Sequence, residues 1–357
     1  MRVLDGLAKA LGGLILLGVL LFLPVLGVTQ RAFHVIYDAP TLAEAVETYW
    51  VGPESLASLG KAYVHKQVQQ TPSSDRTLVF WRALDALSAA QWRTLVSYVA
   101  PQQAVHAVVA QGANALMLWL KTPGAPPKVE VALTPWKQAV RANATPLTSW
   151  LLSQFRECTV PETARWAEAT IRNDWALPPL CVPLGAPRQM WEQMITAAVT
   201  EEVNAAPNAV NLLDPRQVPL QDVESVKNDL WQARRVVNIA LAALAVLWLV
   251  GVLLVGRSFK GWLQAAGVTL LLGGISVAVM GLLPDMVTAW TMGQIASQVP
   301  AWAQASLQGT VAFYVARILS PLRLLGAGTA AVGVVALLVS LLLASHRRDD
   351  MTLERLG

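Results

Sequence analysis

The stretch "VVNIALAALAVLWLVGVLLVGRSFKGWLQAAGVTLLLGGISVAVMGLL", residues 236–283, holds two long apolar runs joined by a short polar turn. A helix needs about 20 apolar residues to cross a hydrocarbon core. Val236–Val255 and Leu263–Leu283 both meet that requirement without a charged residue. Together with the turn "GRSFKGW", they predict a pair of transmembrane helices, which sets the fold class of the chain.

Two further runs, Leu11–Thr29 and Leu324–Leu343, have the same character. Only 14% of the 357 residues are charged, against about 25% in soluble proteins. We therefore predict a mainly α membrane protein with four transmembrane helices, one near the N-terminus and three toward the C-terminus. A cleaved signal peptide is the alternative for the first run. That run is longer than the usual h-region of about 7–15 residues and lacks an A-x-A site, so we interpret it as an uncleaved anchor.

Basic residues in short loops next to transmembrane helices mark the cytoplasmic side. In a four-span arrangement, the basic flanks of the first span, of the "GRSFKGW" turn and of the last span share one side. These residues are Arg2, Lys9, Arg257, Lys260, Arg347 and Arg348. Arg234 and Arg235 give the opposite signal, but they end a long translocated segment, where the rule is weak. The pattern predicts a multi-pass protein of the bacterial cytoplasmic (inner) membrane with both termini cytoplasmic and the large domain outside.

The predicted plan has seven parts. They are the N-terminus with the first span (1–29), an extracytoplasmic domain (30–235), the second span (236–255), the third span (263–283), an outer amphipathic segment (284–323), the fourth span (324–343) and a cytoplasmic tail (344–357). The predicted outer domain contains 18 Lys plus Arg and 18 Asp plus Glu, so it is neutral. This balance argues against a nucleic-acid partner and leaves the lipid bilayer as the first partner.

The outer domain is predicted to be mostly helical, with Pro101 dividing two helices and helix resuming at Pro146. "PGAPPKVEVALTP" instead predicts a short strand element, with Val129, Val131 and Leu133 on one face. We expect that strand to pair with a second short extended piece, whose position the sequence leaves open and for which "AFHVIYD" is one candidate. The stretch "PLQDVESVKNDLWQARR" has no Gly and no internal Pro, which predicts a helix that continues into the second span.

Cys158 and Cys181 are the two cysteines of the chain. An exported location is oxidising, and two cysteines 23 residues apart there usually pair. We predict a disulfide, worth about 3 kcal/mol in the chain-entropy model. Two unpaired buried thiols are the alternative. The spacing excludes a C-x-x-C redox centre, and the other ligands of a zinc site are missing.

Ser58 and Lys61 have the S-x-x-K spacing of serine acyl enzymes and are the candidate catalytic residues. One helical turn can bring a lysine amine to its serine hydroxyl. The S-D-N and K-T-G motifs that complete such a site are absent from the sequence, so a surface turn is the simpler interpretation. We predict a protein that is not an enzyme, with a Ser/Lys envelope hydrolase as a third hypothesis.

No nucleotide, cofactor or metal motif occurs in the sequence, and the four histidines lack the spacing of a helical metal pair. We therefore predict no cofactor and no metal. The ten tryptophans of the outer segment are interpreted mainly as core residues, with a binding face as the alternative. Gly274 with Ala278 and Gly326 with Ala330 have the small-residue spacing that lets helices approach closely.

The segments "WLKTPGAPPKVEVALTPWKQAV", "LLSQFRECTVPE" and "PPLCVP", within this one-plus-three layout, resemble a group of uncharacterised bacterial membrane proteins. Their exported helical domains carry a cysteine near a proline twice. The resemblance covers roughly Gln30–Val255 and implies the layout but no activity. The layout is also similar to that of MacB and FtsX type permeases, which transmit force from a cytoplasmic ATPase. Here "GRSFKGW" leaves an ATPase little to contact.

The leading functional hypothesis is a membrane anchor that binds, or transmits a signal from, an envelope or secreted protein partner through its outer domain. A permease-like subunit of an ABC-type system with a separate ATPase is the alternative. A homo-oligomer stays open.

Overall fold

The computed structural model describes residues 2–176, 178–185, 188–214, 216, 219–256 and 258–353. The chain divides into two compact units. The apolar unit comprises Met1–Asp38 and Pro219–Gly357, and the middle unit comprises Ala39–Val218. Arg257, one of the basic residues used to predict orientation, lies outside the described residues, as do residues 354–357 of the predicted tail.

Within the described residues, the apolar unit has four helices that are long and apolar enough to cross a membrane. They are α1 (Arg2–Ile36), α10 (Leu220–Val255), α11 (Phe259–Met280) and α13 (Ala301–Leu353). Each includes all or most of one predicted apolar run. The residues that flank the apolar runs extend α1, α10 and α13 beyond those runs. The predicted continuity of a polar helix into the second span is confirmed by α10.

The stretch 284–323, predicted as a separate outer segment, is divided between two helices of the apolar unit. It begins with α12 (Pro284–Ile295) and the short 3₁₀ helix η1 (Ala296–Gln298). Its remainder belongs to α13, which runs on through the predicted fourth span. Pro321 lies inside α13 without ending it, because a proline removes one helical hydrogen bond and can leave the turns on either side intact.

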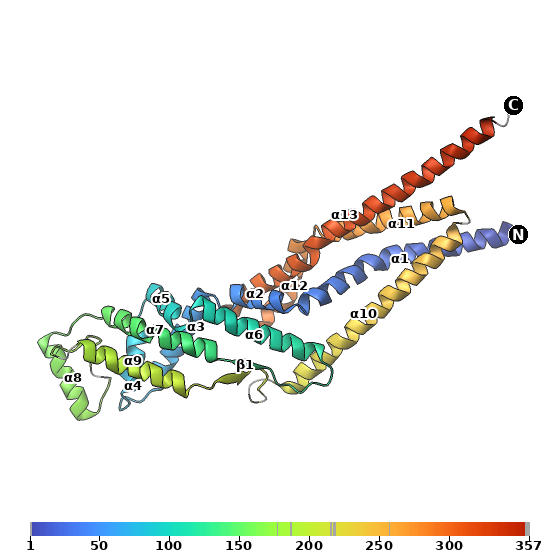
Figure 1. The fold of residues 1–357 in the computed structure, drawn as a ribbon. Coiled ribbons are helices and arrows are strands. Elements are labelled where there is room, and N and C mark those ends of the chain that lie inside the picture. The colour runs from blue at the N-terminus through green and yellow to red at the C-terminus, as the bar shows by residue number, and fades with distance from the viewer. Residues whose placement is uncertain are drawn as a thin grey trace. The chain divides into compact units, whose positions relative to one another are not determined.

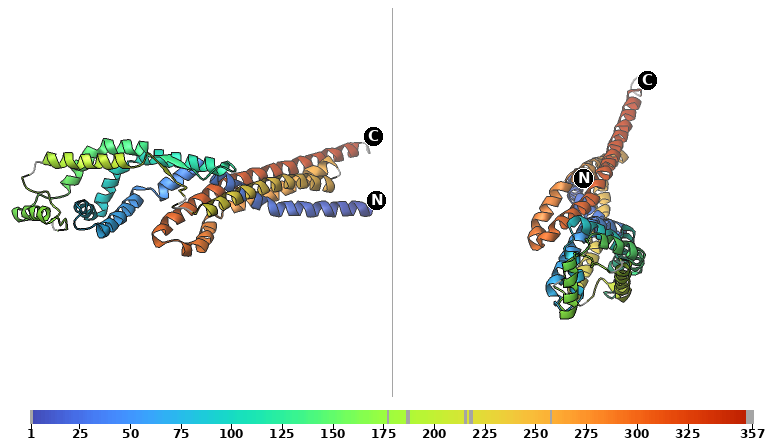
Figure 2. Two further views of the ribbon diagram at one scale, coloured as in Figure 1. Left: turned by 90° about the horizontal axis from the view of Figure 1, so that it is seen from below. Right: turned by 90° about the vertical axis from the view of Figure 1, so that its left-hand side faces the viewer.

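In the apolar unit α1 packs against α10, and α11 packs against α13 (Figures 1 and 2). A Cβ atom placed on Gly12 would lie 2.8 Å from Val255 Cγ2, so α1 and α10 approach closely there. A Cβ on Gly274 would meet the backbone of Gly326 and Ala330 at less than 3.0 Å. The small residues whose spacing allows close approach, Gly274 with Ala278 and Gly326 with Ala330, therefore lie where α11 and α13 meet.

These contacts also show how the two helices of each pair run relative to each other. Gly12, near the start of α1, faces the last turns of α10, and Gly267, near the start of α11, faces Gly333 and Leu337 of α13. Both pairs are therefore antiparallel. The start of α1, the turn after α10 and the last turns of α13 lie at one end of the apolar unit, where Figure 1 marks both termini.

The middle unit is mainly helical. Its helices are α2 (Ala39–Tyr49), α3 (Pro53–Gln70), α4 (Thr77–Asp85), α5 (Ala89–Val99), α6 (Gln102–Lys121), α7 (Thr134–Ser153), α8 (Val160–Arg172) and α9 (Arg188–Ala205). Ser88 and Gln91 form a capping box that starts α5, and Pro101 separates α5 from α6 as predicted. The expectation that helix resumes at Pro146 is wrong. Helix α7 starts at Thr134, with Pro135 in its first turn, where proline is tolerated.

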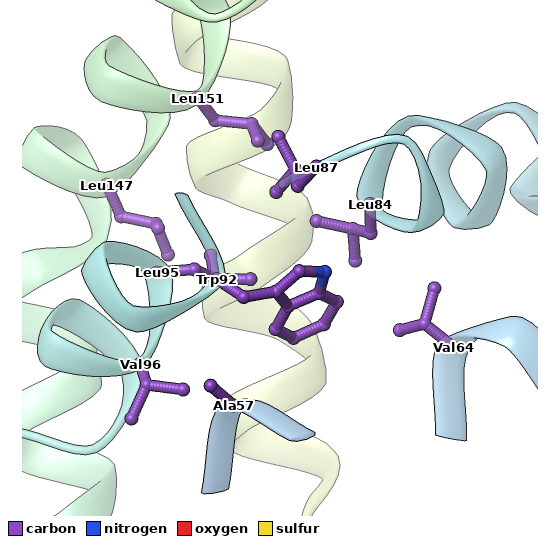
Figure 3. Close-up of a cluster of buried hydrophobic side chains, with 9 residues drawn as sticks. All are labelled: Ala57, Val64, Leu84, Leu87, Trp92, Leu95, Val96, Leu147 and Leu151. Carbon is purple, nitrogen blue, oxygen red and sulfur yellow. The ribbon is translucent and has the colours of Figure 1, made fainter. Parts of the chain in front are cut away.

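Trp92 lies at the centre of a core built from α3, α4, α5 and α7 (Figure 3). Leu84, Leu95 and Leu147 surround it, and all are buried. Gly60 of α3 makes room for the indole, since a Cβ there would lie 2.8 Å from Trp92 Cζ3. A second contact joins α7 to α9, where the Thr196 hydroxyl donates to the buried Thr148 hydroxyl at 3.1 Å.

The predicted strand is present as β1 (Glu130–Ala132), with Val129 and Val131 buried. Its partner is β2 (Ala209–Asn211), which pairs antiparallel so that Val131 lies opposite Val210. Pairing with "AFHVIYD" is wrong, because residues 32–36 of that stretch form the end of α1. The apolar content that suggested a strand there continues the helical surface of the first span.

Candidate binding surface on the disulfide-linked segment

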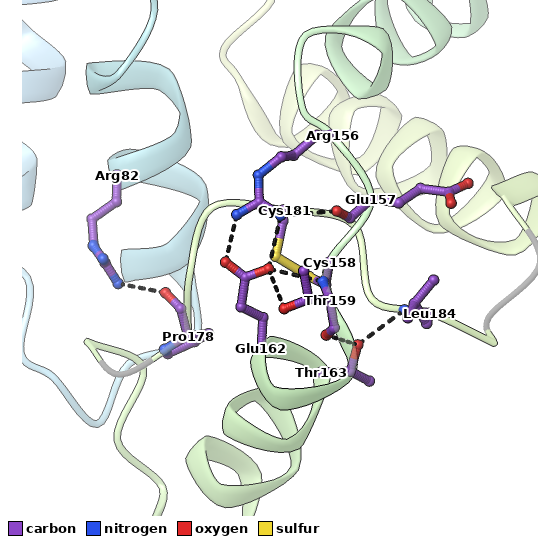
Figure 4. The surroundings of a disulfide bond; sticks show 10 residues. All are labelled: Arg82, Arg156, Glu157, Cys158, Thr159, Glu162, Thr163, Pro178, Cys181 and Leu184. Carbon is purple, nitrogen blue, oxygen red and sulfur yellow. Dashed lines mark hydrogen bonds and ion pairs between the residues drawn. A yellow bond between two sulfur atoms is a disulfide. The ribbon is translucent and has the colours of Figure 1, made fainter.

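Cys158 and Cys181 form the predicted disulfide, with their Cα atoms 5.0 Å apart and 23 residues between them in sequence number. Both are buried. Beside the disulfide drawn in Figure 4, the backbone closes the same junction, because Cys158 N–H donates to Val182 O at 2.8 Å and Val182 N–H donates to Arg156 O at 3.0 Å. The disulfide-linked segment, residues 158–181, is therefore held at its base by one covalent bond and a short backbone ladder.

Glu162 fixes the start of α8. Its carboxylate accepts hydrogen bonds from Arg156 Nη1 at 2.8 Å, from Thr159 N–H at 2.8 Å and from Thr159 Oγ1 at 2.9 Å. These bonds, above all those from Arg156, lower the pKa of Glu162 to about 2. Thr159 and Glu162 form a capping box, which satisfies amide groups that a helix start leaves unpaired.

The part of the segment that follows α8 is attached to α4 and to the loop before α4. Arg82 Nη1 donates to three carbonyl oxygens, those of Ala176 at 2.8 Å, Pro178 at 3.2 Å and Trp175 at 3.4 Å. Trp175 is buried, and its backbone N–H donates to Ser73 O at 2.7 Å. Arg82 thus gives extended backbone the hydrogen-bond donors that it would otherwise lack.

One face of α8 is apolar and exposed. Val160, Ala164, Ala167 and Ile171 follow one another at intervals of four, three and four residues, which places them on one side of a helix. All four are exposed, and Val160 and Ile171 keep 75% and 85% of their accessible surface. We call these four residues the α8 stripe.

The opposite side of α8 faces the rest of the middle unit, including α9. Ala169 is fully buried, and the Trp166 ring meets the Trp191 ring of α9 edge to face, with centroids 6.1 Å apart. The capping box, the Trp pair and the disulfide therefore fix α8 with its apolar stripe turned outward. The sequence analysis interprets the tryptophan of this stretch, Trp166, as a core residue and gives the four stripe residues no role. The spacing was visible in "VPETARWAEATIR", whereas its exposure was not.

Ser58 and Lys61 both lie on α3, but their polar atoms have other partners. The exposed Ser58 hydroxyl donates to Ser55 O at 2.9 Å, and Lys61 Nζ donates to Leu87 O at 3.3 Å. Among the described residues no hydrogen bond joins the two side chains. Their arrangement does not prepare the lysine to accept the serine proton, which a Ser/Lys nucleophile requires.

Two histidines of the middle unit each face a carboxylate. His65 Nδ1 lies 3.3 Å from Asp85 Oδ1, and His106 Nδ1 lies 2.8 Å from Glu47 Oε1. Across the part of the chain that the structure describes, no three His, Cys, Asp or Glu side chains come together as a metal site.

Of the five tryptophans that lie in amphipathic stretches, the core interpretation is confirmed for the two that are buried. Trp92 and Trp119 are buried, and Trp150, Trp166 and Trp191 are half-buried. Trp231 differs, since it lies on α10 of the apolar unit and is exposed.

No family model, curated protein or solved structure matches this chain. Within the described residues, the disulfide-linked segment presents an exposed apolar stripe, and Ser58 and Lys61 form no hydrogen bond with each other.

Proposed function

We propose that this protein is a non-enzymatic anchor of the bacterial inner membrane whose outer domain binds an extracytoplasmic protein through the α8 stripe. The main support for this proposal is the exposure of the α8 stripe. Exposed apolar surface on a helix is unfavourable in water, and contiguous patches of it mark interaction sites. Here the exposure is held in place by the disulfide and by the Glu162 cap.

The stripe suits a helical partner. Its spacing of four and three residues is the one by which helices interlock along a seam. Ala164 and Ala167 occupy the middle, where small side chains let a second backbone approach, and Val160 and Ile171 offer larger contacts at the ends. We infer that the partner is an envelope or secreted protein that contributes an amphipathic helix.

The location outside the cytoplasm rests on two observations. The buried disulfide is typical of an oxidising compartment. The start of α1 with Lys9, the turn with Lys260 and the last turns of α13 share one end of the apolar unit, and a basic end is typical of the cytoplasmic side.

Photo-crosslinking in intact cells tests the proposal. A photoreactive residue replaces Ile171 in the tagged full-length protein, and cross-linked products are purified in mild detergent and identified by mass spectrometry. The matched control replaces Arg165, which is exposed on α8 outside the stripe. We expect one extracytoplasmic protein to cross-link at position 171 and not at 165.

A substitution gives a second reading. Ala167→Glu places a charge in the middle of the seam, and burying an unpaired charge is costly, so we expect co-purification of the partner to fall at least about tenfold. Arg165→Glu should leave co-purification unchanged. Equal cross-linking at both positions, or an Ala167→Glu variant that keeps its partner, contradicts a role for the stripe.

The permease-like alternative has one structural observation in its favour. Helix α10 runs unbroken from Leu220 to Val255, so a movement at one end can be passed to the other. A stoichiometric cytoplasmic ATPase in the same purification would replace the anchor proposal by this alternative.

A further inference from the structure

Helix α12 begins directly where α11 ends. Leu282 N–H donates to Val279 O at 2.9 Å within the turn that joins the two helices, and Pro284 is already the first residue of α12. Because α11 starts at the end of the apolar unit that holds both termini, this turn lies at the opposite end (Figure 1).

The same turn marks the level at which the apolar runs of α11 and α13 end. A Cβ atom on Gly281 would lie 2.7 Å from the backbone nitrogen of Arg323, so these two residues are neighbours. Arg323 directly precedes the uncharged run 324–343 of α13, and its Nε donates to Gly281 O. A basic residue at the end of an apolar run is typical of the border between the hydrocarbon core and the headgroups. Helix α12 therefore starts at this border.

Helix α12 is apolar on two sides. Val287 and Ile295 are half-buried on the side that packs against α13. Four residues on the other side are exposed and follow one another at intervals of three, one and three residues: Met286, Ala289, Trp290 and Gly293. Met286 and Trp290 keep 61% and 69% of their accessible surface. We call these four residues the α12 face.

Charged residues are rare in this part of the sequence. None occurs between Asp285 and Arg317, a stretch that includes all of α12 beyond its first two residues. A helix with apolar residues on all sides is typical of a protein core or of a membrane. The 12 residues of α12 are too few to cross a bilayer, which needs about 20, and such a length suits an interfacial segment.

We propose that the α12 face contacts lipid in the headgroup region of the leaflet away from both termini. Met286 and Trp290 follow Leu283 by three and seven residues, so at about 1.5 Å per residue they lie at most about 5 Å and about 11 Å beyond it. Helical side chains lean toward the start of their helix, which here is the membrane side. The headgroup region is about 5–8 Å thick, and tryptophan favours it. Both side chains are therefore within reach of lipid for any tilt of α12.

A lipid surface suits this face better than a protein partner does. Leu272, Ile275 and Val279 are exposed along one side of α11 up to the turn, and Leu282 is exposed within it. When α11 spans a membrane this surface faces lipid, and the α12 face begins one turn after it ends. Contact between the α12 face and the headgroup region fixes the depth at which α11 and α13 cross. The proposal depends on α11 lying in a membrane and is independent of the α8 stripe.

Fluorescence quenching in reconstituted vesicles tests the contact. The full chain with Met286→Cys is labelled with the fluorophore NBD and placed in phosphatidylcholine vesicles. The native cysteines do not react, because they are bonded to each other. The quenchers are iodide in the water and phosphatidylcholine that carries a doxyl group either near the headgroup or near the end of its acyl chain. Leu272→Cys, exposed within the span of α11, and Ser74→Cys, exposed in the loop between α3 and α4, are the controls for lipid and for water.

We expect the doxyl group near the headgroup to quench the Met286→Cys label at least about threefold more than the Ser74→Cys label, because an interfacial helix buries its apolar face at this depth. Iodide should show the opposite order. The doxyl group near the chain end should quench the Leu272→Cys label more than the Met286→Cys label.

Equal quenching of the Met286→Cys and Ser74→Cys labels by iodide would place the α12 face in water and overturn the proposal. Protection of the Met286→Cys label from all three quenchers means that protein covers the face. Quenching like that of Leu272→Cys means that α12 enters the hydrocarbon core, and either result also overturns the proposal. If Met286→Cys fails to fold, Ala289→Cys reports on the same face and is judged by the same outcomes.

Discussion

Several lysine and arginine side chains of this protein donate to backbone carbonyls, and Lys137, Arg82 and Arg323 do so just beyond the ends of helices. Lys137 is only 4% exposed, and its Nζ donates to Ala206 O, Asn208 Oδ1 and Asn204 O at 2.6, 2.9 and 3.2 Å. Arg82 holds the end of the disulfide-linked segment in the same way, and Arg323 Nε donates to Gly281 O just beyond the end of α11. Carbonyls at helix ends lack partners within the helix and carry partial negative charge, so a cation there supplies donors and favourable electrostatics.

The stability that Glu162 contributes depends on pH. Its folded-state pKa is depressed to about 2, so its bonds to Arg156 and Thr159 stabilise the fold fully above the unfolded pKa of about 4.3. That contribution is lost as the pH falls from there through about 2. We expect the wild type to have a higher Tm than Glu162→Gln at pH 7, and the difference to shrink across this acidic window.

Tryptophan fluorescence during heating, recorded from pH 7 to pH 2 in one detergent, measures that difference. Glu157→Gln is the control, because the Glu157 carboxylate points away from the Arg156 cluster (Figure 4). A Tm difference between wild type and Glu162→Gln that stays constant down to pH 2 contradicts the assigned role of the carboxylate.

At the scale of elements, α11 and α13 meet through backbone. Gly267 faces Gly333, and Gly274 faces Gly326, so each contact lies seven residues from the next on both helices. Glycines at such positions allow the close approach on which helix packing in lipid depends. Added volume at these positions has nowhere to go.

We therefore predict that Gly326→Ala lowers the stability of the detergent-solubilised protein by about 1–3 kcal/mol, since its methyl group would overlap the backbone of Gly274 and Ala278. Gly328→Ala is the matched control on the same helix. A Cβ there meets nothing within 4 Å, and alanine is the better helix former, so Tm should stay or rise. Equal Tm values for the two variants would rule out a tight α11–α13 contact. Thermal unfolding measures both.

Local patterns were enough to predict the continuity of α10 and the cysteine pair, and they identified the small residues at which α11 and α13 meet. The first prediction depends on uninterrupted helix formers, the second on two cysteines in a segment predicted to be exported, and the third on small residues at helical spacing. The partner of β1 was not predictable in this way, because β2 lies nearly eighty residues further along the chain and each strand has only three residues. The α8 stripe shows the same limit. Spacing identifies which face of a helix is apolar, whereas its exposure depends on the fold around it.

At the scale of the whole molecule, the proposed function depends on which parts of the chain lie outside the cytoplasm. Ser258 lies in the turn between α10 and α11, and Ser74 lies in the loop between α3 and α4; both are exposed. The proposed topology puts the first inside the cell and the second outside.

We predict that a membrane-impermeant maleimide labels Ser74→Cys and not Ser258→Cys in intact cells, and labels both after the membrane is permeabilised. The native cysteines stay unreactive without reductant because they are bonded to each other. Labelling of Ser258→Cys before permeabilisation would reverse the orientation, and labelling of the wild type would mean that the disulfide is open in the cell.

The glycine contact between α11 and α13 also affects the order in which the helices pair during synthesis. Helix α1 can pair with α10 as soon as α10 is complete, but the glycines of α11 have their partner only when the second half of α13 has been made. At about 5–20 residues per second, a ribosome takes several seconds to add those residues. During that interval the glycine surface of α11 has no partner on α13, so we expect the α1–α10 pair to form before the α11–α13 pair.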